Sequence, residues 1–92
     1  DDRCIAIEDI NPQAPTHVLI IPKKHISTLL DLETDDTDLV GHLHLKAVEI
    51  ARDRGLSDGF RVLFNCNEAA GQTVFHLHLH LLGGRTFSWP PG

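Results

Sequence analysis

The chain has 92 residues, of which 41% are hydrophobic and 23% charged. This composition indicates one folded domain over residues 1–92 and excludes a disordered tail. Its net charge of −5, from 8 basic and 13 acidic residues, excludes the broad basic surface that binds a nucleic-acid polymer. No apolar run reaches the roughly 18 residues that a membrane span needs. Two cysteines are too few for a disulfide framework, so we expect reduced thiols and a cytoplasmic protein.

Two apolar runs near the N-terminus are typical of β-strands. Residues 4–8 form the first run. Pro12 and Pro15 follow it, and prolines disfavour both helix and the backbone hydrogen bonds between paired strands. Residues 17–21 are rich in β-branched side chains and nearly all apolar, which predicts a buried strand that ends at Pro22. We expect a short helix within residues 22–30.

The middle of the chain predicts one long helix, capped by Thr34 or Asp35 and ended by a left-handed Gly55. Apolar residues at helical spacing are predicted to face the core: Leu39, Leu43, Ala47, Ile50 and Ala51. Leu45 and Val48 lie outside this stripe. A second apolar flank of this kind indicates a second contact, for example with another subunit.

Two further strands are predicted over residues 60–65 and 73–82, separated by a loop of small residues and ended by Gly83 and Gly84. Together, these elements predict an α+β domain. We expect an antiparallel sheet with one long and one short helix, in which the last strand is central.

This last predicted strand carries His76, His78 and His80 at alternate positions. Side chains alternate between the faces of a strand, so the three imidazoles share one face and the intervening leucines face the core. Successive histidines are then about 6.6 Å apart, at ~3.3 Å per residue, so a group the size of phosphate can contact two or three of them. Imidazole titrates near neutral pH, so such a row can combine a neutral nucleophile with protonated donors.

Other interpretations of the row remain open. Any half-exposed strand alternates polar and apolar residues, although three identical histidines are improbable there. Imidazole is also a common zinc ligand, but a structural zinc site takes four ligands, and spacing alone places neither Cys4 nor Cys66. A purification tag would not alternate with leucines. The alternative function is therefore a non-catalytic zinc- or nucleotide-binding interaction module.

The row, followed by two apolar residues, resembles the signature of the histidine triad superfamily of nucleotide hydrolases and transferases. More specifically, the chain resembles the Hint branch, the histidine triad nucleotide-binding proteins. Further segments that resemble this branch occur in the same order: residues 9–17 (DINPQAPTH), 21–26 (IPKKHI), 83–85 (GGR) and 89–92 (WPPG). The resemblance extends over essentially the whole chain. In that branch a helix and a strand precede these segments, so we expect a longer gene product or a segment that was disordered or cleaved.

The resemblance implies adenosine 5′-monophosphoramidase activity, the cleavage of the P–N bond in purine nucleoside monophosphate conjugates of AMP or GMP with an amine. It implies no metal and no other cofactor for the chemistry. It also implies a homodimer, with the sheet extended across the two-fold axis and each C-terminus near the partner's active site.

Residue roles also follow from the resemblance. His78 would attack phosphorus and form a nucleotidyl-histidine, with its other ring nitrogen bound to an acceptor that we expect to be a backbone carbonyl. His76 and His80 would bind phosphate oxygens, and His17 would support them. Asp9 would bind the ribose hydroxyls.

The remaining implied contacts surround the nucleotide. Ile7 and Ile10 would hold the base, although an aromatic residue is common in the branch where Ile7 stands. Trp89 would contact the leaving group in the partner's site. Residues that match positions lining the phosphate and the leaving group are Asn65, Gly71, Gln72 and Thr73. Many members have serine in place of Thr73, and the hydroxyl is kept.

Overall fold

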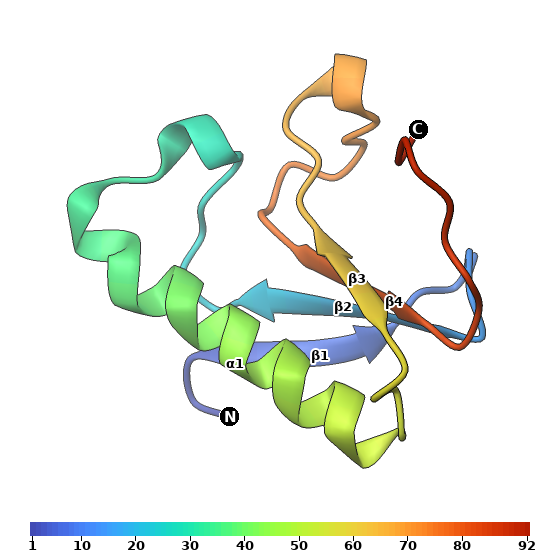
Figure 1. The fold of residues 1–92 in the computed structure, drawn as a ribbon. Helices are drawn as coiled ribbons and strands as arrows, with labels where there is room; N and C mark the ends of the chain where they lie inside the picture. The colour runs from blue at the N-terminus through green and yellow to red at the C-terminus, as the bar shows by residue number, and fades with distance from the viewer.

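Four antiparallel strands form a single sheet, and one helix packs across one of its faces (Figure 1). The computed structural model describes all of residues 1–92. The strands are β1 (Cys4–Glu8), β2 (Thr16–Pro22), β3 (Phe60–Leu63) and β4 (Leu79–Gly83), in the order β1-β2-β4-β3. The helix is α1 (Thr37–Asp53). This confirms the predicted α+β class with an antiparallel sheet in which β4 is an inner strand. No helix is both long and apolar enough to cross a membrane. Extension of the sheet across a dimer stays a prediction.

The two faces of the sheet have different roles. The face under α1 contains the main core, in which buried strand residues pack against buried residues of the helix: Val18, Ile20, Leu79, Leu81, Leu43, Ala47 and Ala51. The strand register pairs Ile7 with Leu19 and Leu19 with His80. Directly opposed residues project from the same face of a sheet, and alternation places this row on the face opposite α1. One face therefore packs against α1 to form the core, and the other carries His80.

Helix α1 has the predicted core face, but it begins later than expected. Residues 34–36 form a separate 3-10 turn, η2 (Thr34–Asp36), and Asp36 occupies the N-cap position of α1. The predicted cap was wrong because the buried Asp36 carboxylate accepts hydrogen bonds from Lys24 at 2.5 Å and from the Glu33 N–H at 2.9 Å. The Lys24 ammonium lowers the pKa of Asp36. Gly55 follows the helix with φ of +69°, as predicted.

The short helix expected within residues 22–30 is reduced to a 3-10 turn, η1 (Leu29–Asp31), closed by a capping box between Thr28 and Asp31. The segment before it remains irregular because its carbonyls bind another part of the chain. The Pro22 carbonyl accepts a hydrogen bond from the His76 ring, and the Ile26 carbonyl accepts one from the Leu77 N–H. These carbonyls are therefore not available to a helical ladder.

The strand predicted over residues 73–82 is shorter than expected, because β4 begins at Leu79. Of the three histidines, only His80 lies in a strand. The β2–β4 ladder pairs Ile20 with Leu79, so extending it by two residues would place Leu77 beside Pro22, which has no N–H to donate. The Leu77 N–H binds the Ile26 carbonyl instead, at 2.6 Å. Side chains of residues 76–78 still alternate between buried and half-buried, although these residues form no strand ladder. Strand β3 likewise ends at Leu63, before the predicted residue 65.

Candidate active site

A cavity of about 420 Å³ lies among the end of β1, strand β2, and the loops that follow β3 and precede β4. It brings together eight of the residues singled out in the sequence: Ile7, Asp9, Ile10, Asn65, Gly71, Thr73, His78 and His80. Glu8, Leu19 and Val74 also line it. His17, His76, Gln72 and Trp89 do not. The cavity therefore joins an apolar end to a carboxylate and two imidazoles.

The orientation of His78 leaves one ring nitrogen free to act as a nucleophile. Its Nδ1–H donates to the His76 carbonyl at 2.8 Å, since a carbonyl oxygen can only accept. In the neutral ring the lone pair then lies on Nε2. The acceptor is a backbone carbonyl, as expected from the sequence. The His78 ring is half-buried and its centroid lies 4.9 Å from that of His80.

A chain of hydrogen bonds sets the tautomers of His17 and His80. The Gln13 N–H donates to His17 Nδ1 at 3.0 Å, so the proton of His17 lies on Nε2. His17 Nε2 then donates to His80 Nδ1 at 2.9 Å, which leaves the hydrogen of His80 on Nε2. His80 thus presents an N–H donor. Burial, followed by the proximity of His78 and His17, lowers the pKa of His80 to about 4, although Asp9 opposes the shift. His80 is therefore an uncharged donor at neutral pH.

Asp9 lies at the edge of the cavity directly after β1. Its Oδ1 accepts the Asn11 N–H at 2.8 Å, and its Oδ2 lies 3.4 Å from His17 Nε2. Its own N–H donates to the His17 carbonyl at 2.9 Å. These contacts hold the carboxylate beside the apolar side chains of Ile7 and Ile10. A charged acceptor in this position forms strong hydrogen bonds with ligand hydroxyls.

Asp9, His17 and His80 are also the residues that could hold a metal ion at this site. Each offers one ligand atom, and the three atoms lie within 4.8 Å of one another. His17 Nε2 would have to give up its proton to bind a metal. The ring would then carry the proton on Nδ1, where the Gln13 N–H already points. The observed bonds therefore favour a chain of hydrogen bonds over metal coordination.

His76 and Gln72, which are expected to contact phosphate, lie behind the cavity. His76 Nε2 donates to the Pro22 carbonyl at 2.8 Å, and its ring packs edge-on against His25. Gln72 is 3% exposed, and its side-chain amide is bound to backbone groups of three other residues. Because β4 begins only at Leu79, these residues do not share the open face of a strand. Neither residue lines the cavity, and their contact with phosphate stays a prediction.

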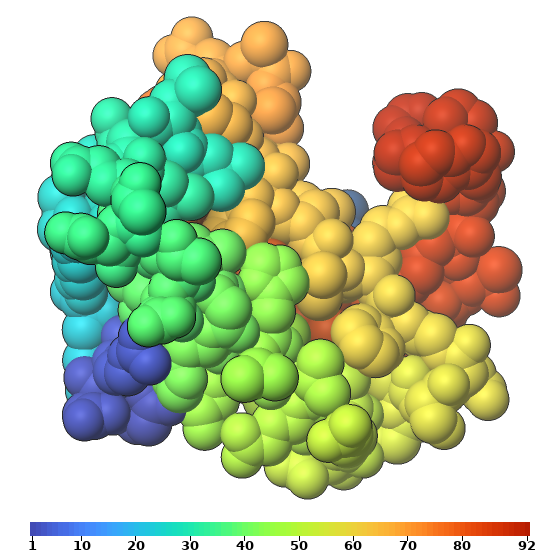
Figure 2. All heavy atoms as spheres, turned by 60° about the vertical axis from the view of Figure 1, so that its left-hand side comes forward, coloured from blue at the N-terminus to red at the C-terminus, as the bar shows by residue number.

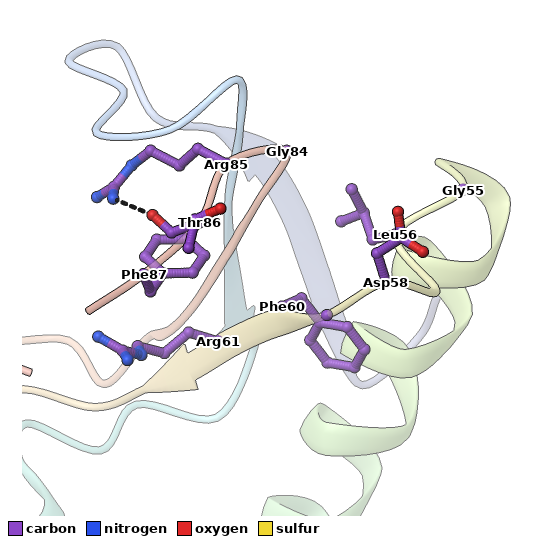
Figure 3. A pocket seen from close by; sticks show the side chains of 10 residues that line it. Gly55, Leu56, Asp58, Phe60, Arg61, Gly84, Arg85, Thr86 and Phe87 are labelled. Atoms are coloured by element: carbon purple, nitrogen blue, oxygen red, sulfur yellow. Dashed lines mark hydrogen bonds between the residues drawn. The ribbon is translucent and has the colours of Figure 1, made fainter. Parts of the chain in front are cut away.

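Trp89 does not line the cavity of its own chain. It is 82% exposed, in a C-terminal tail that projects from the body of the molecule (Figure 2). A second hollow, of about 580 Å³, lies between this tail and the turn from α1 to β3. There the guanidinium carbons of Arg61 and Arg85 lie 5.0 Å and 4.3 Å from the centre of the Phe87 ring (Figure 3). This larger hollow contains no histidine, so it is not the site of imidazole chemistry.

Four contributions to the site were missed in the sequence. Glu8, Leu19 and Val74 line the cavity, and the Gln13 N–H orients His17. Leu19 becomes recognisable once β2 is paired with β4, because it lies opposite His80. A backbone donor such as the Gln13 N–H leaves no signal in residue type.

Comparison with known proteins identifies the family to which this fold belongs. The HIT domain model matches residues 1–87. A HIT-like protein from Synechocystis is 59% identical over 92 residues, which are all of this chain and 81% of that protein. The structure of a HIT family hydrolase from Legionella pneumophila superposes with a TM-score of 0.98 at 53% identity, over 100% of this chain and 83% of the other. A histidine triad protein from Clostridium difficile gives 0.92 at 44% identity, over 96% and 77%. The chain belongs to the HIT domain family.

Proposed function

We propose that this protein hydrolyses the P–N bond between AMP or GMP and an amine, as a member of the Hint branch. The observation that carries the proposal is the pairing of His78 and His80. One ring has its Nε2 lone pair free, and the neighbouring ring offers an uncharged Nε2–H. The similarity to a HIT family hydrolase from Legionella pneumophila supports hydrolytic chemistry.

The cavity suits a nucleoside monophosphate. Its volume of about 420 Å³ is within the usual range of roughly 300–1,000 Å³ for small-molecule sites. Ile7 and Ile10 would contact the base, and the Asp9 carboxylate would accept hydrogen bonds from the ribose hydroxyls. The phosphate would then lie beside His78 and His80. Thr73 and Asn65 both line the cavity, and the resemblance to the Hint branch assigns them to the side where the amine would leave.

The reaction would take place in two displacements. His78 Nε2 attacks phosphorus, the P–Nε2 bond forms and the P–N bond to the amine breaks. The amine leaves with a proton from solvent, relayed by the Thr73 hydroxyl, which gives one proton as it takes another. Water then attacks phosphorus, the P–Nε2 bond breaks, and AMP, neutral His78 and one proton are released. The His80 N–H would stabilise the charge that develops on the phosphate oxygens.

The test is turnover of an AMP–alkylamine phosphoramidate by the purified chain. His78→Ala should lose activity by several orders of magnitude, as on the order of 10⁶-fold is lost in a protease triad, while AMP binding is largely kept. His44→Ala is the matched control, because His44 is an exposed helix residue that contacts the Val40 carbonyl. Mass spectrometry of quenched wild-type reactions should detect a nucleotidyl adduct on His78. A His78→Ala protein that kept a tenth of the activity would contradict the nucleophile assignment.

The same experiment distinguishes the alternative, a non-catalytic zinc- or nucleotide-binding module. Exhaustive chelation should leave the rate and the fold unchanged, because imidazoles that bind phosphate need no metal. Activity that was lost on chelation and restored by stoichiometric zinc would contradict the proposed mechanism. Nucleotide binding without any turnover or adduct would favour the binding module.

We further propose a cytoplasmic homodimer in which Trp89 acts in the partner's site. Leu45, on the second apolar flank of α1, is 68% exposed, and a second copy would cover such a flank. Trp89 is 82% exposed and does not line the cavity of its own chain, so its indole is available to a second copy. Cys4 and Cys66 are both free, which supports a reducing compartment.

A further inference from the structure

We propose that Gln72 is a positioning residue that holds the cavity wall against the leaving group without contacting the nucleotide. This inference rests on the proposed function. Its two neighbours in sequence, Gly71 and Thr73, both line the cavity. Gln72 itself is 3% exposed and is not among the lining residues. Its side chain therefore lies directly behind the wall that presents Thr73.

The amide of Gln72 connects three segments of the chain. Its Oε1 accepts the Asn67 N–H at 2.8 Å, and its Nε2 donates to the Ser27 carbonyl at 2.8 Å and to the Val74 carbonyl at 3.1 Å. The Gln72 N–H also donates to the Asn67 carbonyl at 3.1 Å, which closes a ring of two bonds between these residues. Both amide hydrogens and the carbonyl oxygen are thus used inside the protein, so none is left for a phosphate.

The wall needs this support because it has no strand ladder of its own. Residues 72–78 form neither helix nor strand. Apart from the bonds of Gln72, they are connected to other segments by hydrogen bonds from His76 to Pro22 and from Leu77 to Ile26. Asn67 has φ of +68° and ψ of 176°, a backbone conformation that residues other than glycine rarely adopt. The two bonds to Gln72 stabilise Asn67 in this conformation. Asn65, two residues earlier, lines the cavity.

Loss of the amide should therefore displace Thr73 and Asn65 while leaving His78 and His80 in place. His80 is held in β4 by backbone pairing, and His78 by its bond to the His76 carbonyl. A displacement of about 1 Å at a reacting group can cost roughly 10²-fold in rate. The loss should fall on the step in which the amine receives its proton. A direct contact to phosphate would instead affect every substrate and the binding of AMP.

The experiment compares two substrates of Gln72→Glu and Gln72→Met. An AMP–alkylamine phosphoramidate needs a proton on its leaving group, whereas the p-nitrophenyl ester of AMP does not. We expect kcat for the phosphoramidate to fall by about 10- to 100-fold, with kcat for the ester and Kd for AMP changed by less than about threefold. Glu68→Gln, an acid–amide exchange at an exposed position in the same loop, is the matched control. Equal losses on both substrates together with weaker AMP binding would overturn the proposal.

The pH dependence of Gln72→Glu gives a readout that loss of fold would not produce. A protonated glutamic acid can donate to Ser27 or Val74 and accept from Asn67, whereas the carboxylate repels both carbonyls. The ratio of mutant to wild-type kcat for the phosphoramidate should therefore rise as the pH falls from 8 to 5.5. A ratio that stayed constant would contradict the positioning role.

Hydrogen exchange in the wild-type protein tests the same inference without turnover and without a variant that must fold. The side-chain amide of Gln72 and the Asn67 N–H should exchange at least about tenfold more slowly than the side-chain amide of Gln13, which is exposed and bonded to Asn11. Fast exchange at Gln72 would overturn the inference. Slow exchange in a protein without phosphoramidase activity would instead reject the proposed function and keep the wall-holding role of Gln72.

Discussion

His80 should make the stability of the protein depend on pH, and the dependence can be isolated with His80→Gln. The pKa of His80 is lowered from 6.5 to about 4, because the ring is partly buried and lies beside His78 and His17, with Asp9 opposing the shift. Below pH 6.5 the unfolded chain therefore binds a proton at His80, whereas the folded chain binds it only near pH 4. Stability is therefore fully kept above pH 6.5 and falls as the pH drops through this window.

The size of the effect follows from the two pKa values. Linkage between 6.5 and about 4 gives a loss of about 2.4 kcal/mol in the free energy of unfolding from pH 7 to pH 4.5. Because His80 is only half-buried, solvent screening reduces the expected loss to about 1–2 kcal/mol. Glutamine is chosen because its Oε1 can accept the hydrogen of His17 and it carries no charge at either pH.

The assay is urea unfolding of wild type and His80→Gln at pH 7 and pH 4.5. The other titrating groups are common to both proteins, so the difference between them isolates His80. We expect wild type to lose about 1–2 kcal/mol relative to the variant on going to pH 4.5. A difference that stays constant within about 0.3 kcal/mol, or that changes in favour of wild type, would refute the description of His80 as a half-buried neutral donor.

Three further predictions concern the tail, the ribose contact and the turn after β4. Trp89→Ala should change selectivity among amine leaving groups more than it changes AMP binding. Mixed dimers with a His78→Ala chain should regain wild-type selectivity. If selectivity stayed that of the Trp89→Ala protein after subunit exchange, the contact would lie within one chain. Asp9→Asn should reduce the preference for ribose over 2′-deoxyribose substrates by about tenfold in kcat/KM, because a neutral acceptor binds hydroxyls more weakly, and an unchanged ratio would count against the ribose contact. Gly84→Ala should lower the free energy of unfolding, measured in urea, by at least about 1 kcal/mol. The reason is that Gly84 has φ of +88° and an added Cβ would lie 2.9 Å from Pro15. A variant as stable as wild type would contradict this close approach of the turn to Pro15.

The sequence predicted the antiparallel sheet, the core face of α1 and the inner position of β4, because these depend on local apolar patterns. It also predicted that His78 would bind a backbone carbonyl. The extent of β4 was wrong because alternation alone does not show what lies beside a strand. The ladder with β2 ends where Pro22 would have to donate, and that information lies more than fifty residues from Leu77 in the chain.

The predictions about site residues that failed did so for a similar physical reason. Gln72 appeared to be a phosphate contact by its position in the motif, but its contacts with Ser27 and Asn67 depend on tertiary structure. The predicted cap of α1 was misplaced because the Asp36 side chain accepts a hydrogen bond from Lys24, twelve residues earlier in the chain. Local patterns indicate candidate site residues, whereas long-range hydrogen bonds decide which of them line the cavity.

The two-sided sheet places unlike demands on adjacent residues of β4. Leu79 and Leu81 are fully buried against α1, so a change there alters how many molecules are folded. His80, between them, lines the cavity, so under the proposed function a change there alters what each folded molecule can do as well as how stability depends on pH. If the proposed function holds, alternate side chains of the same strand govern the amount of folded protein and its turnover per molecule. The strand could then gain a new specificity on one face while its packing on the other stays intact.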